Sequence, residues 1–323
     1  MKVESGAAPP TQWTRRRERS NRWQLRAMRR LALAAGRRAT RVLLHPIVCW
    51  YILDAETRRH SASYLTRALG RRATWRDVYR HLHTFSATVL DRVYLLQERF
   101  EEFRFEASGF EAILEPVARG DGVLAFGAHL GSFEALRMIG HEKGLRVAMI
   151  MYEDNARLIN ETLAAIAPKS ELRTIALGRV DAMLALSRWL DEGGVAGLLA
   201  DRTLAVPSQR SKAVALPFLG APALFPDGPF RLAAMLRRRV VFMAGLYRGG
   251  RDYELRFIQL ADFGTLAATG AQPAAERDAA IRAALERYVA TLEALCREAP
   301  YNWFNFYDFW ADAEPAARAR DAS

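Results

Sequence analysis

The sequence predicts an α/β fold, a three-layer sandwich around a mixed, mostly parallel sheet, with a helical region at the N-terminus. Two observations predict it. Beyond residue 100, short apolar runs of strand length alternate with longer stretches of helical periodicity, which is typical of a sheet covered by helices. Before residue 100, the chain is basic and its apolar residues recur at helical spacing. A chain of 323 residues, half of them apolar, can bury a substantial core.

The predicted strands are short apolar runs bounded by glycine, polar or charged residues. They cover 123–126, 147–151, 174–177, 195–200, 240–246 and 253–260. The predicted helices between and after them cover 133–142, 156–166, 182–192, 229–238 and 274–298. Gly193 and Gly194 end one of these helices before a strand. Together these elements form a domain predicted to span 101–310.

The region from 12 to 100 is predicted to be basic, helical and membrane-associating. Residues 1–80 hold 19 Lys and Arg against 5 Asp and Glu, although the whole chain has a net charge of only +11. Leu25, Met28, Ala32 and Ala35 can share one helical face, with Arg26, Arg29, Arg30 and Arg37 around the rest. The apolar run 42–53 is too short to span a bilayer and contains Pro46. An apolar segment flanked by arginine favours a helix lying in the interface of an anionic membrane.

Other interpretations of this region are less favoured. A signal peptide does not fit, because Arg37 and Arg38 interrupt the short apolar stretch before them. Nucleic-acid binding stays possible, since clustered arginine with tryptophan also occurs in phosphate-tracking arms. It would not need the apolar run that follows. Residues 1–11 and 311–323 are poor in large apolar side chains and are predicted to be disordered.

His129 and Glu134 lie where the chain leaves the first predicted strand and enters a helix, the edge at which open α/β sheets bind ligands. With His129 in the turn and Glu134 in the first helical turns, the two side chains can meet. A carboxylate that accepts the imidazole Nδ1–H fixes the tautomer and raises the basicity of the other nitrogen. The pair is then a candidate general base. The same spacing also fits a solvated histidine and a glutamate favoured by the helix dipole.

Several segments, in a fixed order, resemble one protein family. Gly-x-His-x4-Glu at 127–134 is similar to the first motif of the lysophospholipid acyltransferase superfamily, in the branch of the bacterial lipid A acyltransferases. Asp201-Arg202 at a strand end, Phe-x-Gly-x-Pro at 218–222 and the aromatic block 300–310 follow in the order seen in that branch. The resemblance covers roughly residues 40–310. It implies an enzyme that moves a fatty acyl group from an acyl thioester to a hydroxyl of a lipid or glycolipid acceptor.

From this combination we expect His129 to take the proton of the acceptor hydroxyl, while Glu134 holds the imidazole and supplies negative charge. Backbone N–H groups of Leu130 and Gly131, at the helix start, are candidates to stabilise the tetrahedral oxyanion. Asp201 and Arg202 would position the acceptor head group or the thioester, unless they are a local ion pair at the sheet edge. No residue of the aromatic ending is assigned to catalysis, since it fits an acyl groove, a membrane rim or plain core packing.

Two departures from the family pattern limit what carries over. The second block of lipid A enzymes usually has an arginine after its tyrosine, whereas Tyr152 is followed by Glu153 and Asp154, and only Asn155 fits. A cation expected near acceptor phosphates is therefore missing there. Gly228 lies in a segment that imitates the Phe-Pro-Glu-Gly-Thr block of related acyltransferases. It follows the Phe-x-Gly segment, so Asp201-Arg202 is the better counterpart by order.

The resemblance implies an acyl carrier protein or coenzyme A as the donor and the cytoplasmic face of the bacterial inner membrane as the location. Carrier proteins are acidic, and Arg237 to Arg239 form the densest basic patch outside the N-terminal region, unless they are a solvated helix terminus. Cys49 and Cys296 form neither a disulfide framework nor a zinc pattern, and His81 and His83 are expected on a solvated helix face. No metal and no cofactor is expected. An acyl thioesterase, or a non-catalytic membrane- or nucleic-acid-binding protein, is the alternative.

Overall fold

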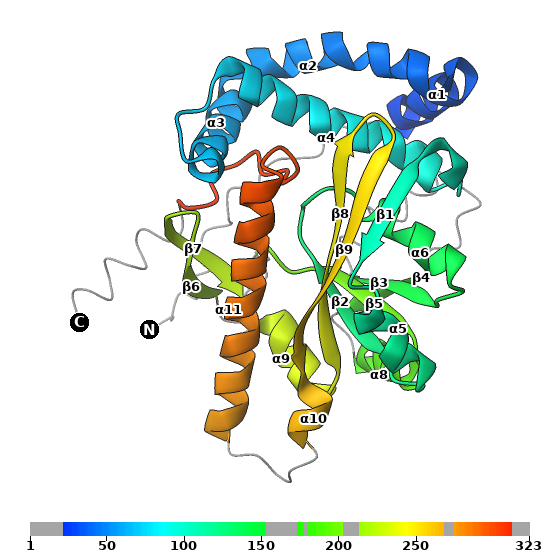
Figure 1. Cartoon of the computed structure of the whole chain (residues 1–323), viewed down its shortest axis with the longest axis vertical. Helices are drawn as coiled ribbons and strands as arrows, with labels where there is room; N and C mark the ends of the chain where they lie inside the picture. The colour runs from blue at the N-terminus through cyan, green and yellow to red at the C-terminus, as the bar shows by residue number, and fades with distance from the viewer. Residues whose placement is uncertain (1–21, 153–172, 178–179, 203–212, 268–273, 312–323) are drawn as a thin grey trace, which may run out of the picture.

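The computed structural model describes residues 22–152, 173–177, 180–202, 213–267 and 274–311 (Figure 1). Its centre is a seven-stranded sheet in the order β1-β9-β8-β2-β5-β3-β4. The strands are β1 Arg104–Ser108, β2 Val123–Gly127, β3 Val147–Tyr152, β4 Arg173–Leu177, β5 Val195–Leu199, β8 Arg239–Gly249 and β9 Asp252–Asp262. β8 and β9 pair antiparallel, and every other neighbouring pair in this sheet is parallel. The mixed, mostly parallel sheet is confirmed.

Helices cover both faces of the sheet. They are α1 Arg22–Val42, α2 Leu44–Leu53, α3 Ala55–Leu69, α4 Trp75–Leu95, α5 Glu111–Ala118, α6 Arg137–Glu142, α8 Val180–Asp191, α9 Gly228–Met235, α10 Phe263–Ala267 and α11 Ala274–Glu298, with short 3-10 turns η2 Phe100–Glu102 and η3 Glu134–Leu136. Successive residues of β2 face opposite sides, so Phe126 joins the core under α8, α9 and α11, and Ala125 joins the core under α4, α5 and α6. The sheet thus has one apolar core on each face, each covered by helices, as the predicted three-layer α/β fold requires.

All six predicted strands are confirmed, with ends that move by a few residues, and 274–298 is confirmed as α11. Three strands were not predicted: β1 and the two strands of a separate hairpin, β6 Ala213–Phe218 and β7 Ala221–Pro226. The short helices α5 and α10 were not predicted either. The expected helix 133–142 begins instead as a 3-10 turn, η3, and continues as α6. The predicted helix 156–166 and the predicted disordered segment 1–11 lie outside the described residues, as does all of 311–323 but its first residue.

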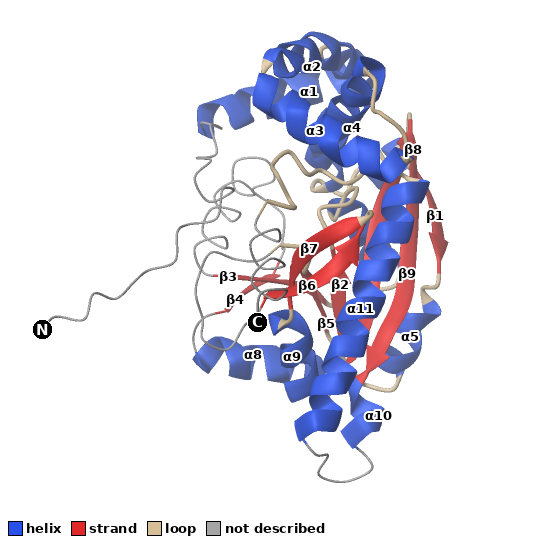
Figure 2. Ribbon diagram, turned by 90° about the vertical axis from the view of Figure 1, so that its left-hand side faces the viewer, coloured by secondary structure: helices blue, strands red, loops and turns tan. Residues whose placement is uncertain are grey.

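Helices α1 to α4 form a layer at one end of the sheet (Figures 1 and 2). Within α1, Gly36 takes φ 78° and divides the helix into two segments. None of the described helices is long and apolar enough to cross a membrane. The run 42–53 forms the end of α1 and helix α2, and it exposes large apolar side chains: Val42, Leu43, Ile47, Trp50, Tyr51 and Leu53.

The predicted face of α1 is wrong at Ala35 and at Arg37, the two residues that flank Gly36. Ala32 is buried, but Ala35 is exposed and Arg37 is buried. The break at Gly36 turns the second segment of the helix, so the positions after it no longer follow the periodicity of the first. The Arg37 side chain then points into the protein, where it forms an ion pair with the buried carboxylate of Asp91.

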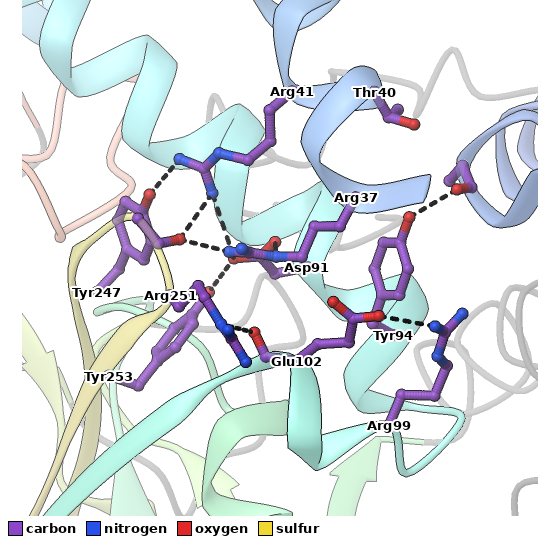
Figure 3. Close-up of polar contacts among 12 residues, drawn as sticks. Arg37, Thr40, Arg41, Asp91, Tyr94, Arg99, Glu102, Tyr247, Arg251 and Tyr253 are labelled. Atoms are coloured by element: carbon purple, nitrogen blue, oxygen red, sulfur yellow. Dashed lines mark hydrogen bonds and ion pairs between the residues drawn. The ribbon is translucent and has the colours of Figure 1, made fainter. Parts of the chain in front are cut away.

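Asp91 of α4 is the acceptor that holds this arginine (Figure 3). Arg37 Nε and Nη2 donate to its two carboxylate oxygens at 2.7 and 2.8 Å, and both side chains are buried. Tyr253 of β9 donates to the same carboxylate at 3.0 Å. The carbonyl of Gly250, in the β8–β9 turn, accepts from Arg37 at 2.6 Å and from Arg41 at 3.1 Å. The helical layer is thereby joined to the tip of the β8–β9 hairpin.

A second connection runs through His81 of α4, which the sequence placed on a solvated face. It is fully buried. Its ring nitrogens pair with the Ser61 hydroxyl at 2.8 Å and with the Trp303 carbonyl at 2.9 Å. Burial lowers the pKa of His81 to about 4, although the hydrogen bond to the Trp303 carbonyl opposes this. On the neighbouring helix, the Tyr64 hydroxyl donates to the Pro300 carbonyl at 2.8 Å. Helices α3 and α4 therefore contact the C-terminal segment, residues 300–310, from one side.

Replacing Asp91 by asparagine should destabilise the protein by about 3 kcal/mol, because Arg37 would stay buried without a counter-charge. Urea unfolding followed by circular dichroism measures this. Tyr253→Phe is the matched control, since it removes one hydrogen bond to the same carboxylate and should cost only about 1 kcal/mol. Equal stability of Asp91→Asn and the wild type would contradict the role given to this ion pair.

Candidate functional site

Two neighbouring parallel strands bring His129 and Asp201 together. β2 and β5 pair in register, with Gly127 opposite Leu199. His129 comes two residues after the end of β2, and Asp201 comes two residues after the end of β5. Because the carboxyl ends of parallel strands meet at one sheet edge, equal distances from these ends place the two residues side by side. His129 Nδ1 lies 2.8 Å from Asp201 Oδ1.

The Asp201 carboxylate is fully buried and has three donors. Besides the contact with His129 Nδ1, Oδ2 accepts from the His129 backbone N–H at 3.0 Å and from Trp303 Nε1 at 3.1 Å. Burial alone would raise the pKa of Asp201. The attraction and hydrogen bonds of His129 and the charge of Arg202 outweigh it, so the pKa lies well below its usual range. An ionised carboxylate can only accept, so Nδ1 carries the ring hydrogen and Nε2 is free to act as a base.

The pKa of His129 is lowered from its ordinary value of 6.5. Burial is the main cause and the positive charge of Arg202 is the second, while Asp201 acts in the opposite direction. Arg92 also contributes to the lowering. The imidazole is therefore neutral at pH 7, with about a third of its side chain exposed. A neutral, accessible imidazole oriented by a carboxylate can take a proton from a substrate hydroxyl.

The C-terminal segment holds the loop that carries His129. The Gly131 N–H donates to the Asn302 carbonyl and the Phe304 N–H donates to the His129 carbonyl, both at 2.8 Å. Trp303, between these partners, is fully buried. Its ring packs edge-on against Tyr64 of α3, with 4.9 Å between ring centroids. The aromatic ending thus belongs to the core, and one of its side chains also fixes Asp201.

Gly131 and Gly245 of β8 meet in a close backbone crossing. Gly131 has φ 71°, and a Cβ atom there would lie 2.0 Å from the Gly245 carbonyl oxygen. A Cβ atom on Gly245 would lie 2.3 Å from the Ser132 carbonyl oxygen. The Ser132 N–H donates to the Gly245 carbonyl at 2.8 Å. The loop after His129 therefore rests directly on the β8 backbone.

The expected contact between Glu134 and His129 is wrong in this structure, because Nδ1 faces Asp201. Glu134 Oε1 lies 2.7 Å from Arg92 Nε of α4, and Oε2 accepts from the Ser132 hydroxyl at 3.1 Å. The reason is the path of the loop. Residues 130–132 bridge to 245 and 303 before the chain enters η3 at Glu134, which turns this side chain toward α4.

Of the two backbone N–H groups predicted to stabilise the oxyanion, those of Leu130 and Gly131, only one is without an acceptor among the described residues. The Gly131 N–H is used by Asn302, so its predicted role does not fit this structure. No described residue accepts a hydrogen bond from the Leu130 N–H. Leu130 therefore remains a candidate donor for a developing oxyanion.

Of the other predicted residues, Arg202 lies at the site. It donates to the Phe304 carbonyl at 3.0 Å and lies over the Tyr307 ring. Asn155 lies outside the described residues. Gly228 begins α9, whose Phe230 packs on Phe126 in the core, and no described contact joins Gly228 to His129.

The basic patch 237–239 is at the other edge of the sheet. Arg239, the first residue of β8, pairs in register with Val123, the first residue of β2. Gly245, which lies beside Gly131, is six residues further along β8, or roughly 20 Å. Arg238 and Arg239 also form ion pairs with Asp191 and Asp262.

Comparison with known proteins gives one family. The family model described as bacterial lipid A biosynthesis acyltransferase matches residues 88–306. This range contains both His129 and Asp201, together with most of the C-terminal segment that holds them. No curated protein matches the chain significantly.

Asp201→Asn should lower turnover at least about a hundredfold, since an amide neither favours the Nδ1–H tautomer nor stabilises the imidazolium. Glu134→Gln should lower it much less, because Glu134 contacts Arg92 rather than the imidazole. The measurement is steady-state turnover of the two variants beside the wild type, with circular dichroism to confirm that both are folded. A larger loss for Glu134→Gln than for Asp201→Asn would show that Glu134 is the partner of the base during the reaction.

Proposed function

The chain belongs to the bacterial lipid A biosynthesis acyltransferase family, which transfers acyl groups to a lipid acceptor, and we propose that here the donor is an acyl thioester and His129 is the general base. The observation that carries this proposal is the pair His129–Asp201: a neutral imidazole, partly exposed, whose Nδ1 faces a buried carboxylate. No nucleophilic side chain of the protein is needed, because a thiolate is a good leaving group.

The proposed reaction has two steps. His129 Nε2 takes the proton of the acceptor hydroxyl as its oxygen bonds to the thioester carbon, which gives a tetrahedral oxyanion. The oxyanion then collapses, the C–S bond breaks, and the imidazolium returns its proton to the departing thiolate. Asp201 stabilises the imidazolium between the two steps. The Leu130 N–H is the backbone donor proposed for the oxyanion.

Positive charge near His129 supports an acceptor that carries anionic groups. Arg92 and Arg202 both lie close enough to lower the pKa of the imidazole. They come from α4 and from the turn after β5, and they are the cations proposed to bind the acceptor, because the sequence has no arginine directly after Tyr152. Glu134 orients Arg92 through their ion pair. A phosphate on the acceptor matches two guanidinium groups in this position.

We propose that the acyl donor is a thioester of an acyl carrier protein or of coenzyme A, which present the same reacting group. The patch 237–239 gains no support as a docking site for a carrier protein, since it lies at the opposite sheet edge and its side chains at 238 and 239 are already paired. We expect the thioester to enter from the edge that carries His129.

The proposed location is the cytoplasmic face of the bacterial inner membrane, with the protein attached to the surface. The exposed apolar side chains of 42–53 support this, since a monomer rarely leaves so many large apolar groups in water side by side. Trp50 and Tyr51 are the residue types that collect at the membrane–water interface.

His129→Ala should lower acyl transfer at least about a hundredfold, because the acceptor hydroxyl loses its base. The assay follows the acylated lipid by mass spectrometry, with an acyl thioester and a lipid A precursor as substrates. In the wild type, consumption of thioester should require the acceptor. Release of free fatty acid at the same rate with and without acceptor would identify a thioesterase instead.

On the acid side, kcat/KM should fall with a pKa below 6.5, because protonation of Nε2 removes the base and the pKa of His129 is lowered. Arg202→Gln should move this fall to higher pH, since it removes a charge that disfavours the imidazolium. A pH–rate profile of both proteins checks the direction. An acid limb that moves to lower pH in the variant would contradict the electrostatic role of Arg202.

Trp50→Ser combined with Leu53→Ser should release the protein from anionic vesicles at high salt. These side chains are 74% and 72% exposed, and their apolar contribution to the membrane-binding free energy is not screened by salt. Sedimentation with vesicles measures it. Leu184→Ser combined with Met235→Ser is the matched control, since those side chains are also exposed but lie on α8 and α9. Equal release of both variants would argue against α2 as the attachment site.

A further inference from the structure

A groove between α3 and the start of α4 is lined by basic side chains. Its volume is about 970 Å³. Arg58, Arg59, Arg67 and Arg72 line it, and no aspartate or glutamate is among its lining residues. Neither His129 nor Asp201 is among the residues that line it. The groove is therefore separate from the catalytic pair.

The charge of this groove is not neutralised by the described residues. Arg59 and Arg72 have exposed side chains, and no described residue accepts a hydrogen bond from their guanidinium groups. Arg58 donates only to a backbone carbonyl, that of Ile52. In contrast, Arg71 in the same turn is paired with Asp77 at 2.8 Å. An arginine cluster of this kind, without carboxylates, has the chemistry of a phosphate site.

The surroundings of the groove are apolar. Ala62, Ala73 and Val78 line it beside the arginines. Trp75, at its rim, is 69% exposed. The groove also includes Ala55, which begins α3 directly after the end of α2. It therefore continues the exposed apolar surface of α2, at the end of the molecule where the helical layer lies (Figure 1).

We propose that this groove binds the phosphate head group of an anionic membrane lipid. The guanidinium groups of Arg59 and Arg72 hold the phosphate, with Arg58 beside them, and the apolar lining takes the part of the lipid next to the head group. A groove of this volume is of the size that holds one small ligand. The inference rests on the proposed function in one respect, namely that the protein works at a membrane surface.

A lipid fits these observations better than an acidic carrier protein. The basic side chains are continuous with the large apolar side chains of α2, which a bilayer would cover and a soluble acidic protein would not. Tryptophan at the rim, here Trp75, is typical of the membrane interface. Clusters of basic residues on amphipathic helices attract anionic lipid head groups by the same combination.

The test compares binding of the full-length protein to phosphatidylcholine vesicles with and without phosphatidylglycerol. Arg59→Gln combined with Arg72→Gln should weaken binding to the anionic vesicles at least about tenfold, because two cations that contact phosphate are removed. Arg188→Gln combined with Arg277→Gln is the matched control. It removes the same charge from exposed positions on α8 and α11 and should change the affinity less than about twofold.

A double lysine variant distinguishes a specific phosphate site from non-specific attraction between the basic surface and the anionic membrane. Arg59→Lys combined with Arg72→Lys keeps the charge and loses the planar pair of donors, so it should bind anionic vesicles more weakly than the wild type. Binding of the lysine pair equal to that of the wild type would overturn the proposal in favour of diffuse charge. Loss of affinity of the glutamine pair for an acidic acyl carrier protein, with vesicle binding unchanged, would also overturn it.

Vesicle binding is measured without turnover, so this result is independent of the proposed reaction. The glutamine pair should also keep wild-type acyl transfer with a soluble acyl thioester and a detergent-dispersed acceptor. Loss of that activity together with normal vesicle binding would show that the groove serves catalysis, and would overturn its assignment to a membrane lipid.

Discussion

The register between β2 and β5 brings together the two residues on which the proposed chemistry depends. Gly127 lies opposite Leu199, so the residues that follow the two strands leave the sheet side by side. His129 and Asp201 are 72 residues apart in the chain, and only this pairing brings them within hydrogen-bond distance. A shift of the register would send the following side chains to different places and dissolve the pair. The catalytic proposal therefore depends on a property of the sheet rather than on a local motif.

A buried carboxylate is costly unless donors surround it. Asp201 is fully buried and has three, two from His129 and one from Trp303. Trp303 is in turn held by Tyr64 and His81 of the helical layer. The helices that carry the exposed apolar surface thus belong to the same packed unit as His129 and Asp201. The Arg37–Asp91 ion pair, with the hydrogen bond from Arg37 to the Gly250 carbonyl, connects the helical layer to the tip of the β8–β9 hairpin.

Much of this was predictable from the sequence, and the failures have physical causes. The buried strands and α11 were found because their periodicity is clear. β1 was missed because it lies at the sheet edge and carries mostly exposed residues. The β6–β7 hairpin was missed because Pro217 and Pro222 within it argue against strands. His129 was predicted as a site residue from its place after a strand, and its partner was sought nearby in the chain, at Glu134, whereas the structure pairs it with Asp201. Spacing along one segment does not show which strands are neighbours, whereas equal offsets from two strand ends would have pointed to Asp201.

The crossing of Gly131 and Gly245 has a consequence for protein engineering. A side chain at either position would collide with backbone of the other segment, so the two positions have no freedom to vary independently. Libraries that aim to change acceptor preference should keep both glycines and place their diversity in the side chains that face the imidazole from other elements. Arg92 and Arg202 are such positions, since each comes from a segment that does not take part in the crossing. The two glycines must therefore be kept together, whereas the charged side chains near the proposed base can be varied one at a time.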